Sequence, residues 1–231
     1  MKNTAIVLAG GSGKRMGTAV KKQYLELKGR PVLAYSLCLF EKSPLIREII
    51  LVTSKEEMAY CREHILAKYG ISKAVKIVEG GKERKDSVYA GLKACEDSDY
   101  VFIHDGARPF VDDAMLERLL RDAGAYGASI AAMPVKDTIK IADAGQNIID
   151  TPDRTCLWQA QTPQVFSYPL ILSAYRKALK EQAAHLTDDA SCVEYAGLGK
   201  VHLTPGSYEN IKITTKEDLL LAEAICEKYV K

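Results

Sequence analysis

The stretch AIVLAGGSGKRMG, residues 5–17, joins an apolar run long enough for one buried strand to a glycine-rich turn and two adjacent cations. Glycine has no Cβ and allows φ > 0, so backbone N–H groups in such a turn can approach an anion closely. N–H groups that point inward form an anion-binding concavity, to which Lys14 and Arg15 add full positive charges. The stretch therefore predicts a strand followed by a polyphosphate-binding loop. The alternative is an ordinary tight turn between a strand and a helix.

The spacing of the glycines excludes the two best-known phosphate-binding loops. A P-loop has a hydroxyl residue after its Gly-Lys pair, whereas here Arg15 follows Gly13 and Lys14. A dinucleotide-binding fingerprint has a glycine where this chain has Met16, one residue before Gly17. What remains is a nucleotide-binding loop that carries its own cations, as expected of an enzyme that stabilises charge on a transferred phosphorus.

The composition is that of a globular protein, with 47% hydrophobic and 27% charged residues in a chain of 231. A net charge of +2 gives no strong field that would favour nucleic acid. No apolar run approaches the ~20 residues of a membrane span, and the first strand begins too early for a targeting peptide. Six cysteines and four histidines are scattered without a Cys-x-x-Cys pair. We therefore expect neither zinc nor disulfides, but reduced thiols in the cytoplasm.

Strand and helix patterns alternate along the first part of the chain. Strand-like runs lie at residues 4–8, 48–53, 75–78, 100–104 and 129–134, and helix-like stretches at 31–42, 54–69, 86–95 and 114–123. Such alternation predicts one α/β domain over residues 1–231, with a mostly parallel sheet covered on both faces. The loops that follow residues 8, 78 and 104 are rich in glycine or charge, and right-handed crossovers would gather them at one edge of the sheet.

The pattern becomes irregular after residue 134. Residues 137–142 and 148–154 flank a turn and predict a hairpin arm at about 136–157. Because a two-stranded ribbon is marginal alone, we expect the arm to pack on a second subunit; a mobile loop is the alternative. Further helices are expected at 169–184, from 187, and after 214, with short strands at 200–203 and 210–213.

Three polar side chains lie where chemistry is expected. Asp105 follows a strand and could hold Mg²⁺, or it could cap the turn and pair with Arg108. Lys22 could lie over the glycine-rich loop or be solvated. Lys212, between two isoleucines, would face either a phosphate crevice or water at a sheet edge. Nothing indicates a covalent nucleophile, whereas cations and backbone donors suit phosphoryl or nucleotidyl transfer.

Taken together, these motifs resemble those of the 2-C-methyl-D-erythritol 4-phosphate cytidylyltransferase family. The matching stretches span the chain in order: LAGGSGKRM (8–16), KQY (22–24), GGKERKDS (80–87), HDGARP (104–109), DR (153–154) before LW (157–158), QTPQ (161–164), TDDAS (187–191) and NIKIT (210–214). The related ribitol-5-phosphate cytidylyltransferases share much of this pattern but more often lack the GARP sequence at 106–109. Lys21 is a departure, since the family commonly has proline there.

The resemblance implies a Rossmann-like nucleotidyltransferase of GT-A-like type: an α/β three-layer sandwich with a mostly parallel sheet and a protruding β-hairpin arm through which two chains form a homodimer. It implies that CTP and 2-C-methyl-D-erythritol 4-phosphate react to give 4-diphosphocytidyl-2-C-methyl-D-erythritol and pyrophosphate, with Mg²⁺ or another divalent cation. A pyrophosphorylase for ribitol 5-phosphate or a hexose 1-phosphate, and a nucleotide-binding regulator without turnover, are the alternatives.

The resemblance also implies roles for individual residues. Arg15 and Lys22 would stabilise the transition state, and Arg154 and Lys212 would position the sugar phosphate. The substrate site would be lined by Asp105, Arg108, Thr138, Thr162 and Thr187. The nucleotide would be held by Ala9, Gly10, Gly11, Gly13, Gly81 and Ser87. Asp105 is the candidate metal ligand, with the ion held mainly by phosphate oxygens.

Overall fold

The computed structural model describes residues 1–10 and 21–229 of the chain. The strands are β1 (Asn3–Leu8), β2 (Glu26–Leu27), β3 (Arg30–Pro31), β4 (Glu48–Thr53), β5 (Ala74–Glu79), β6 (Tyr100–Asp105), β7 (Ala128–Pro134), β8 (Ile141–Ala142), β9 (Ile148–Asp150), β10 (Trp158–Ser167) and β11 (His202–Pro205). The helices are η2 (Lys22–Tyr24), α1 (Val32–Lys42), η3 (Lys55–Glu57), α2 (Met58–Tyr60), η4 (Cys61–Ala67), α3 (Arg84–Ala94), α4 (Asp113–Tyr126), η5 (Arg154–Cys156), α5 (Tyr168–Lys180), α6 (Asp189–Ala196) and α7 (Lys216–Tyr229).

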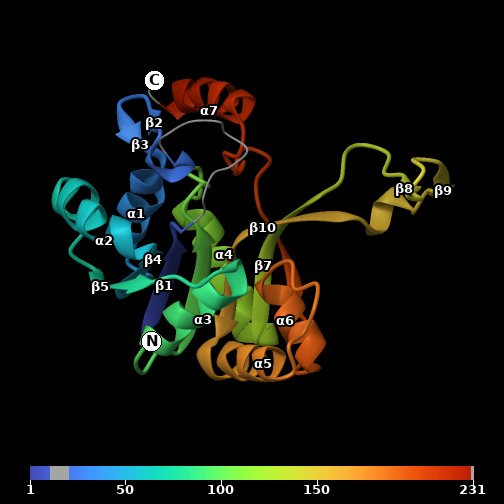
Figure 1. Ribbon diagram of the computed structural model, residues 1–231, viewed down its shortest axis with the longest axis horizontal. Coiled ribbons are helices and arrows are strands. Elements are labelled where there is room, and N and C mark those ends of the chain that lie inside the picture. Colours follow the sequence, from blue (N-terminus) through green and yellow to red (C-terminus); the bar gives the residue numbers. More distant parts are fainter. Residues whose placement is uncertain (11–20, 230–231) are drawn as a thin grey trace.

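Seven of the described strands form one sheet, in the order β11-β7-β10-β6-β1-β4-β5 (Figure 1). β10 is antiparallel to both of its neighbours, β6 and β7, while the other adjacent strands are parallel. The mostly parallel α/β sheet is therefore confirmed. The strands expected at 4–8, 48–53, 75–78, 100–104 and 129–134 are β1, β4, β5, β6 and β7, with ends that agree within one residue.

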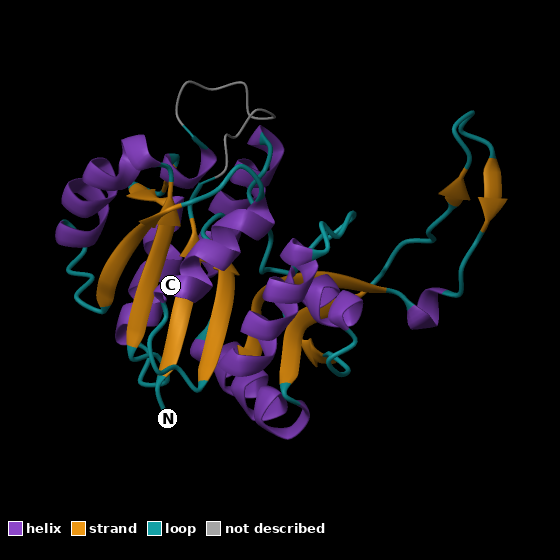
Figure 2. Ribbon diagram, turned by 60° about the horizontal axis from the view of Figure 1, so that its bottom comes forward, coloured by secondary structure: helices purple, strands orange, loops and turns teal. Residues whose placement is uncertain are grey.

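Helices cover both faces of the sheet and form the three layers of the sandwich with it (Figure 2), and two apolar clusters lie between these layers. Side chains of a strand alternate between its faces, so Val7 of β1 points into one cluster and Ile6 into the other. Helices α1, η4 and α4 contribute to the first cluster, and α3, α5 and α6 to the second. A third cluster packs α7 on the β2–β3 hairpin through Leu27 and Ala222.

The register of the strands brings three loops to one edge. Leu8 at the end of β1 pairs with Val52 of β4 and with Asp105 of β6. Hydrogen bonds then continue past the strand ends, from Gly106 N–H to the Leu8 carbonyl (2.9 Å) and from Gly80 N–H to the Thr53 carbonyl (2.8 Å). The loops after residues 8, 78 and 104 therefore meet, as the alternation of strands and helices predicts.

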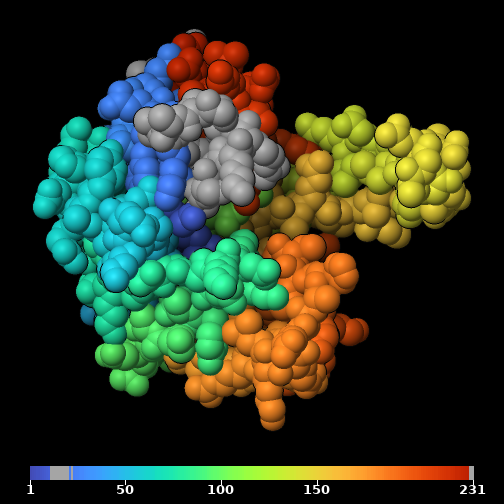
Figure 3. Space-filling view, in the orientation of Figure 1, coloured from blue at the N-terminus to red at the C-terminus, as the bar shows by residue number. Residues whose placement is uncertain are grey.

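A hairpin arm projects from the body of the molecule between β7 and β10 (Figure 3). Its root is closed by a hydrogen bond from Val135 N–H to the Leu157 carbonyl (3.0 Å), and its tip by the antiparallel pair β8–β9. The protruding β-hairpin arm is confirmed, although its paired strands are shorter than expected. The arm exposes large apolar side chains, among them Ile139, Ile141, Ile148 and Ile149.

Three local expectations need correction. Residues 210–213 form no strand, because Ile213 N–H bonds to the Ala107 carbonyl while its side chain packs in the α7 cluster. The helix expected over 54–69 is divided into a 3-10 turn, one α-helical turn and a π-helix. The antiparallel strand β10 was not anticipated, since the run QTPQ within it is polar and contains a proline. The extent of the domain, residues 1–231, stays a prediction.

No helix in the described part of the chain is both long enough and apolar enough to cross a membrane.

Candidate active site

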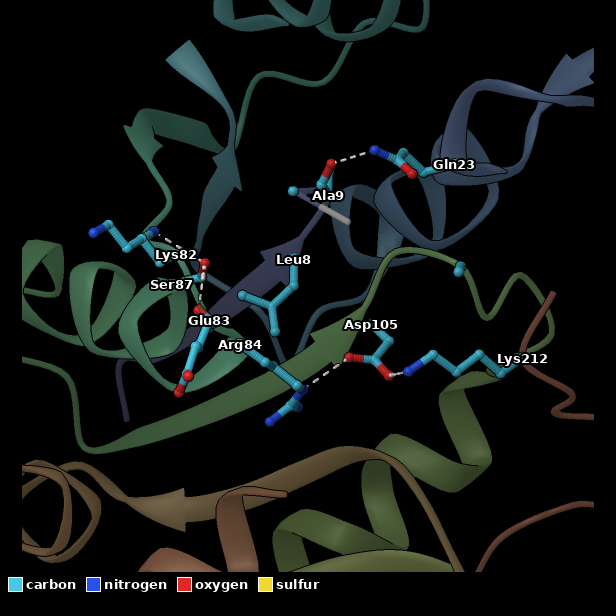
Figure 4. Close-up of a pocket in the computed structure, with 12 residues that line it drawn as sticks. Leu8, Ala9, Gln23, Lys82, Glu83, Arg84, Ser87, Asp105 and Lys212 are labelled. Atoms are coloured by element: carbon cyan, nitrogen blue, oxygen red, sulfur yellow. Dashed lines mark hydrogen bonds and ion pairs between the residues drawn. The ribbon is translucent and has the colours of Figure 1, made fainter. Parts of the chain in front are cut away.

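A cavity of about 380 Å³ opens at the carboxyl ends of β1 and β6 (Figure 4). Its lining includes six residues that the sequence singled out: Ala9, Gly10, Gly81, Ser87, Asp105 and Lys212. The remaining lining residues are Leu8, Gln23, Lys82, Glu83, Arg84 and Ala107. Residues as far apart in sequence as Leu8 and Lys212 thus meet in one place, as the edge of a doubly covered sheet permits.

The loop after β5 has a shape that depends on glycine. A Cβ on Gly81 would lie 2.2 Å from the Cβ of Asp86, so any other residue would force the loop away from α3. Glu83 caps α3 in a capping box with Asp86, whose carboxylate accepts from Glu83 N–H at 3.0 Å. Ser87 Oγ accepts from Gly81 N–H at 3.1 Å. The start of α3 is thereby held against the cavity with its backbone donors nearby.

A chain of charges crosses the floor of the cavity. Lys212 Nζ lies 2.6 Å from Asp105 Oδ2, and Arg84 Nε lies 3.3 Å from Asp105 Oδ1 (Figure 4). Burial would raise the pKa of Asp105, but the two cations outweigh it and hold that pKa well below its usual range. Asp105 is therefore a carboxylate. Its carboxylate forms ion pairs with Arg84 and Lys212. The alternative, in which Asp105 caps the turn and pairs with Arg108, is not what the described residues form.

A second cavity of about 230 Å³ adjoins the first and shares Arg84, Asp105 and Lys212 with it. The predicted substrate residues Arg108, Thr162 and Thr187 line this second cavity. The rest of its lining comes from Ala160, Gln161, Gln164 and Asp188. One set of charges therefore stands between two adjoining cavities.

Arg108 has a partly buried guanidinium that contacts no carboxylate among the described residues. Its Nη1 donates to the Asn210 carbonyl at 2.7 Å, and its Nε has no hydrogen-bond partner. Burial lowers the pKa of Arg108, and Asp105 opposes that effect only partly. Since a buried donor without a partner is costly, the side chain is well placed to receive an anion.

Thr162 lines the second cavity, and the fully buried His104 lies behind it. A shift in the pairing of β10 between Ala160 and Gln164 takes Thr162 out of the ladder, as a β-bulge does. Its Oγ1 accepts from Asp105 N–H at 3.0 Å and lies 3.1 Å from His104 Nδ1. Because His104 Nε2 donates to the Arg108 carbonyl at 3.0 Å, Nδ1 is the acceptor and the Thr162 hydroxyl donates to it. His104 therefore has a structural role, in holding Thr162 and the Arg108 carbonyl.

Arg84 and Asp189 are site residues to which the sequence analysis gave no role. The Arg84 guanidinium lies 2.9 and 2.7 Å from the two carboxylate oxygens of Asp189, which is fully buried at the start of α6. Burial opposes the charge on Arg84, but Asp189 and Asp105 raise its pKa well above the usual value. Both residues lie in motifs that the sequence displays, GGKERKDS and TDDAS. The sequence signal that could have identified them is a charged residue at the start of each of the helices α3 and α6.

Six predicted site residues are not brought to the cavities by the described part of this chain. Thr138 and Arg154 lie in the arm, where Arg154 Nη1 donates to the Lys136 carbonyl at 2.8 Å. Gly11, Gly13 and Arg15 lie outside the described residues. The backbone of Lys22 begins the turn η2, but its side chain is not among the parts that the structure describes.

Neighbouring groups hold the η2 turn close to the first cavity. The Gln23 amide donates to the Ala9 carbonyl, and the Tyr24 hydroxyl lies 3.2 Å from Thr53 Oγ1. Lys21, the departure from the family pattern, forms an ion pair with Glu57 at 3.0 Å. The backbone of η2 is thus attached to β1 and to the end of β4.

Comparisons of the sequence and of the structure with known proteins identify the same family. A family model described as 2-C-methyl-D-erythritol 4-phosphate cytidylyltransferase matches residues 3–228. A protein of that name from Clostridium novyi (strain NT) is 50% identical over 226 residues, which cover 98% of this chain and 97% of the relative. Another from Lachnospira eligens is 51% identical over 221 residues, 95% of this chain and 97% of the relative.

The fold is similar to solved structures as well. The structure of 4-diphosphocytidyl-2C-methyl-D-erythritol synthase from Anaerococcus prevotii DSM 20548 matches with a TM-score of 0.85 and 35% sequence identity, covering 98% of each chain. The likeness extends over nearly the full length in both sequence and structure.

Proposed function

This chain belongs to the 2-C-methyl-D-erythritol 4-phosphate cytidylyltransferase family, and we propose that it transfers the cytidylyl group of CTP to 2-C-methyl-D-erythritol 4-phosphate in its two adjoining cavities. The products are 4-diphosphocytidyl-2-C-methyl-D-erythritol, an isoprenoid precursor, and pyrophosphate. The observation that carries the proposal is that Arg84, Asp105 and Lys212 line both cavities. A nucleotide in one cavity and a phosphate monoester in the other would meet at these charges.

We assign the nucleotide to the larger cavity. Ala9, Gly10, Gly81 and Ser87 line it with small side chains and backbone groups. Gly11 and Gly13, which lie outside the described residues, are proposed to bind the nucleotide as well. Backbone donors that cradle a pyrimidine and its phosphates limit the size of base that fits.

The sugar phosphate is assigned to the smaller cavity. Arg108 offers a guanidinium that contacts no carboxylate among the described residues, and Thr187 offers a hydroxyl to the sugar alcohol. The Thr162 oxygen, already bonded to His104 and to Asp105 N–H, can offer only its remaining lone pair. Lys212 stands at the boundary, where it would hold the phosphate beside the α-phosphorus of CTP. Asp105 would orient Lys212 and accept from a substrate hydroxyl.

The chemistry requires charge neutralisation rather than a general base. The second pKa of a phosphate monoester is about 6, so the attacking oxygen is already ionised at neutral pH. The barrier is the repulsion between two anions and the charge that develops as pyrophosphate leaves. Arg15 can spread a planar fork over two oxygens, while Lys22 acts as a point charge. Cations fixed in advance stabilise such a transition state without reorganisation.

Magnesium, or another divalent cation, is the proposed cofactor, carried in by the triphosphate. The described residues include no group of three or more acidic, histidine or cysteine side chains arranged to hold a metal ion. Asp105 has one oxygen in contact with Lys212 and the other in contact with Arg84. The protein therefore suits such an ion only when phosphate oxygens and water supply most of its ligands. When bound, the ion would neutralise charge on the triphosphate.

We also propose that the arm forms a homodimer and completes the partner's substrate site. The arm that carries Thr138 and Arg154 projects away from the body of the molecule (Figure 1), and neither residue lines the two cavities. The exposed isoleucines of the arm would be buried in the dimer. All six cysteines lie in the described part as free thiols, which fits the proposed cytoplasmic location.

The activity is tested by pyrophosphate release with CTP, UTP and ATP against a panel of sugar phosphates. We expect release with CTP and 2-C-methyl-D-erythritol 4-phosphate, and little with ribitol 5-phosphate or a hexose 1-phosphate. Preference for ribitol 5-phosphate would reassign the substrate. Calorimetric binding of CTP without release on any sugar phosphate would show a regulator instead of an enzyme.

The roles of Arg15 and Lys22 are tested by single alanine substitutions. Loss of one preorganised donor typically costs ~10²–10³ in rate, so Arg15→Ala and Lys22→Ala should each lower kcat on that scale. The affinity for CTP should change far less, because these charges act chiefly in the transition state. Near-normal turnover in either variant would remove that residue from the role.

A further inference from the structure

Arg84 connects the nucleotide side of the site to the sugar side. It is the first residue of α3, directly after the loop that lines the larger cavity. Its Nη1 and Nη2 contact Asp189 at 2.9 and 2.7 Å, and its Nε contacts Asp105 at 3.3 Å. One guanidinium therefore joins the start of α3, the end of β6 and the start of α6.

Asp189 holds this guanidinium firmly in place. Its side chain is fully buried, and its Oδ1 also accepts from the Tyr175 hydroxyl at 2.6 Å. Its backbone N–H and that of Ala190 donate to Gln164 Oε1 at 3.0 and 3.1 Å. A two-pronged contact to a buried carboxylate is strong and directional, so Arg84 is not free to move onto a substrate.

Lys212 has the opposite character. Its side chain is flexible and 35% exposed, and its ammonium contacts Asp105. To bind a phosphate at the boundary of the cavities, this ammonium must turn away from Asp105. The side chain of Asp105 is only 9% exposed, so it would then be left as a poorly hydrated charge unless another cation remained beside it. Arg84 is the cation already in contact with it.

We propose that Arg84 is a positioning residue for the sugar phosphate: anchored by Asp189, it stays on Asp105 and so allows the ammonium of Lys212 to transfer from that carboxylate to the incoming phosphate. The proposal rests on the cytidylyltransferase function set out above. Arg84 acts through Asp105 and Lys212, and its effect belongs to the sugar phosphate and not to CTP.

Steady-state kinetics with each substrate varied in turn test this proposal. A hydrogen bond to a charged group is worth ≈ 1.5–3 kcal/mol, so in Arg84→Gln we expect the KM for 2-C-methyl-D-erythritol 4-phosphate to rise roughly 10- to 100-fold. The KM for CTP should stay within about threefold, a split that general loss of structure would not give. Arg84→Lys keeps a charge near Asp105 but loses the fork, and should fall between wild type and Arg84→Gln.

Two further variants separate positioning from folding. Arg84→Gln alone leaves Asp189 as a buried unpaired charge, whereas Arg84→Gln with Asp189→Asn removes both charges. This double variant should regain thermal stability and still show the raised KM for the sugar phosphate. The control Arg176→Gln makes the same change at an exposed arginine of α5 and should leave both KM values unchanged.

Three outcomes are decisive. If the KM for CTP rises as much as that for the sugar phosphate, or if neither rises in a folded variant, the proposal is wrong. It is equally wrong if the double variant restores a normal KM, because Arg84 would then serve only to neutralise Asp189. Absence of pyrophosphate release by the wild-type chain would instead refute the function on which the proposal rests.

Discussion

Protonation of His104 would remove the acceptor for the hydroxyl of Thr162, a residue that lines the proposed sugar-phosphate cavity. Its Nδ1 accepts from the Thr162 hydroxyl, and burial lowers the pKa of the ring from 6.5 to about 4. Because the folded chain binds the proton less tightly than the unfolded chain, the unfolded state takes up more protons between pH 6.5 and 4. We expect the free energy of unfolding to be full above this window and to fall by about 3 kcal/mol across it.

Denaturant unfolding at several pH values checks this expectation against His104→Gln, which keeps a donor and an acceptor but does not titrate. The variant should be less sensitive to pH between about 6.5 and 4. Asp105 is a separate contribution: its pKa is held low, so its stabilisation is lost only as the pH falls below the ordinary value of 3.8. Equal slopes in wild type and variant would show that another group titrates in this window.

At the level of single residues, the sequence predicted several of the side chains that gather at the site, but it did not predict which of them form direct contacts. Asp105 and Lys212 are 107 positions apart, and the family resemblance assigned both to the substrate site, although the residues alone also allowed a turn cap and a water-facing lysine; they are in contact. Arg84 could not be paired with Asp189 in advance, since that contact depends on how α6 packs beside α3. The apolar residues of α3 and α6 set this packing, but their pattern in the sequence does not indicate which charged side chains of the two helices will contact each other.

At the level of elements, the predictable parts are those whose pattern is set by burial on both sides. β4 was located to the residue because all of Glu48–Thr53 lies within the sheet and five of its six residues are buried. β10 was missed because Gln161, Thr162 and Gln164 turn polar groups into the site, where they bond to other loops. A functional strand therefore violates the apolar pattern by which strands are recognised.

The arm has an exposed apolar surface that would be stabilised by contact with a partner chain. Ile149 is 64% exposed in β9, and Ile141 and Ile148 are exposed beside it. A charge buried in an apolar interface is costly, so Ile149→Glu should convert the proposed dimer to monomer, as measured by sedimentation at micromolar concentration. The fold should be unaffected, because this side chain is exposed in the single chain.

Val75→Glu is the matched control for the arm, since Val75 is 53% exposed on the edge strand β5, which is separated from β10 by β6, β1 and β4. It should leave the oligomeric state unchanged. A wild-type chain that sediments as a monomer, or an Ile149→Glu dimer of wild-type affinity, would contradict the proposed role of the arm.

At the scale of the whole molecule, the site as described in one chain lacks two of its predicted residues. Thr138 and Arg154 lie in the arm, and neither belongs to the lining of the two cavities. In a twofold-symmetric dimer both chains use the same surface patch in the interface, so each arm can contribute residues to the site of the partner chain. Arg154 would then act in the partner's cavity, and Lys22 in that of its own chain.

Mixed dimers distinguish an arm that acts on the partner from one that acts on its own chain. If Arg154 acts across the dimer, pairing an Arg154→Ala chain with a Lys22→Ala chain puts both defects in one site and leaves the other intact. Random mixing then gives about half heterodimers with one intact site each, hence about a quarter of the wild-type activity. If Arg154 acts within its own chain, every site carries one defect and the mixture stays as inactive as its parents. Remixing each variant with itself is the control, because it repeats the exchange without creating an intact site.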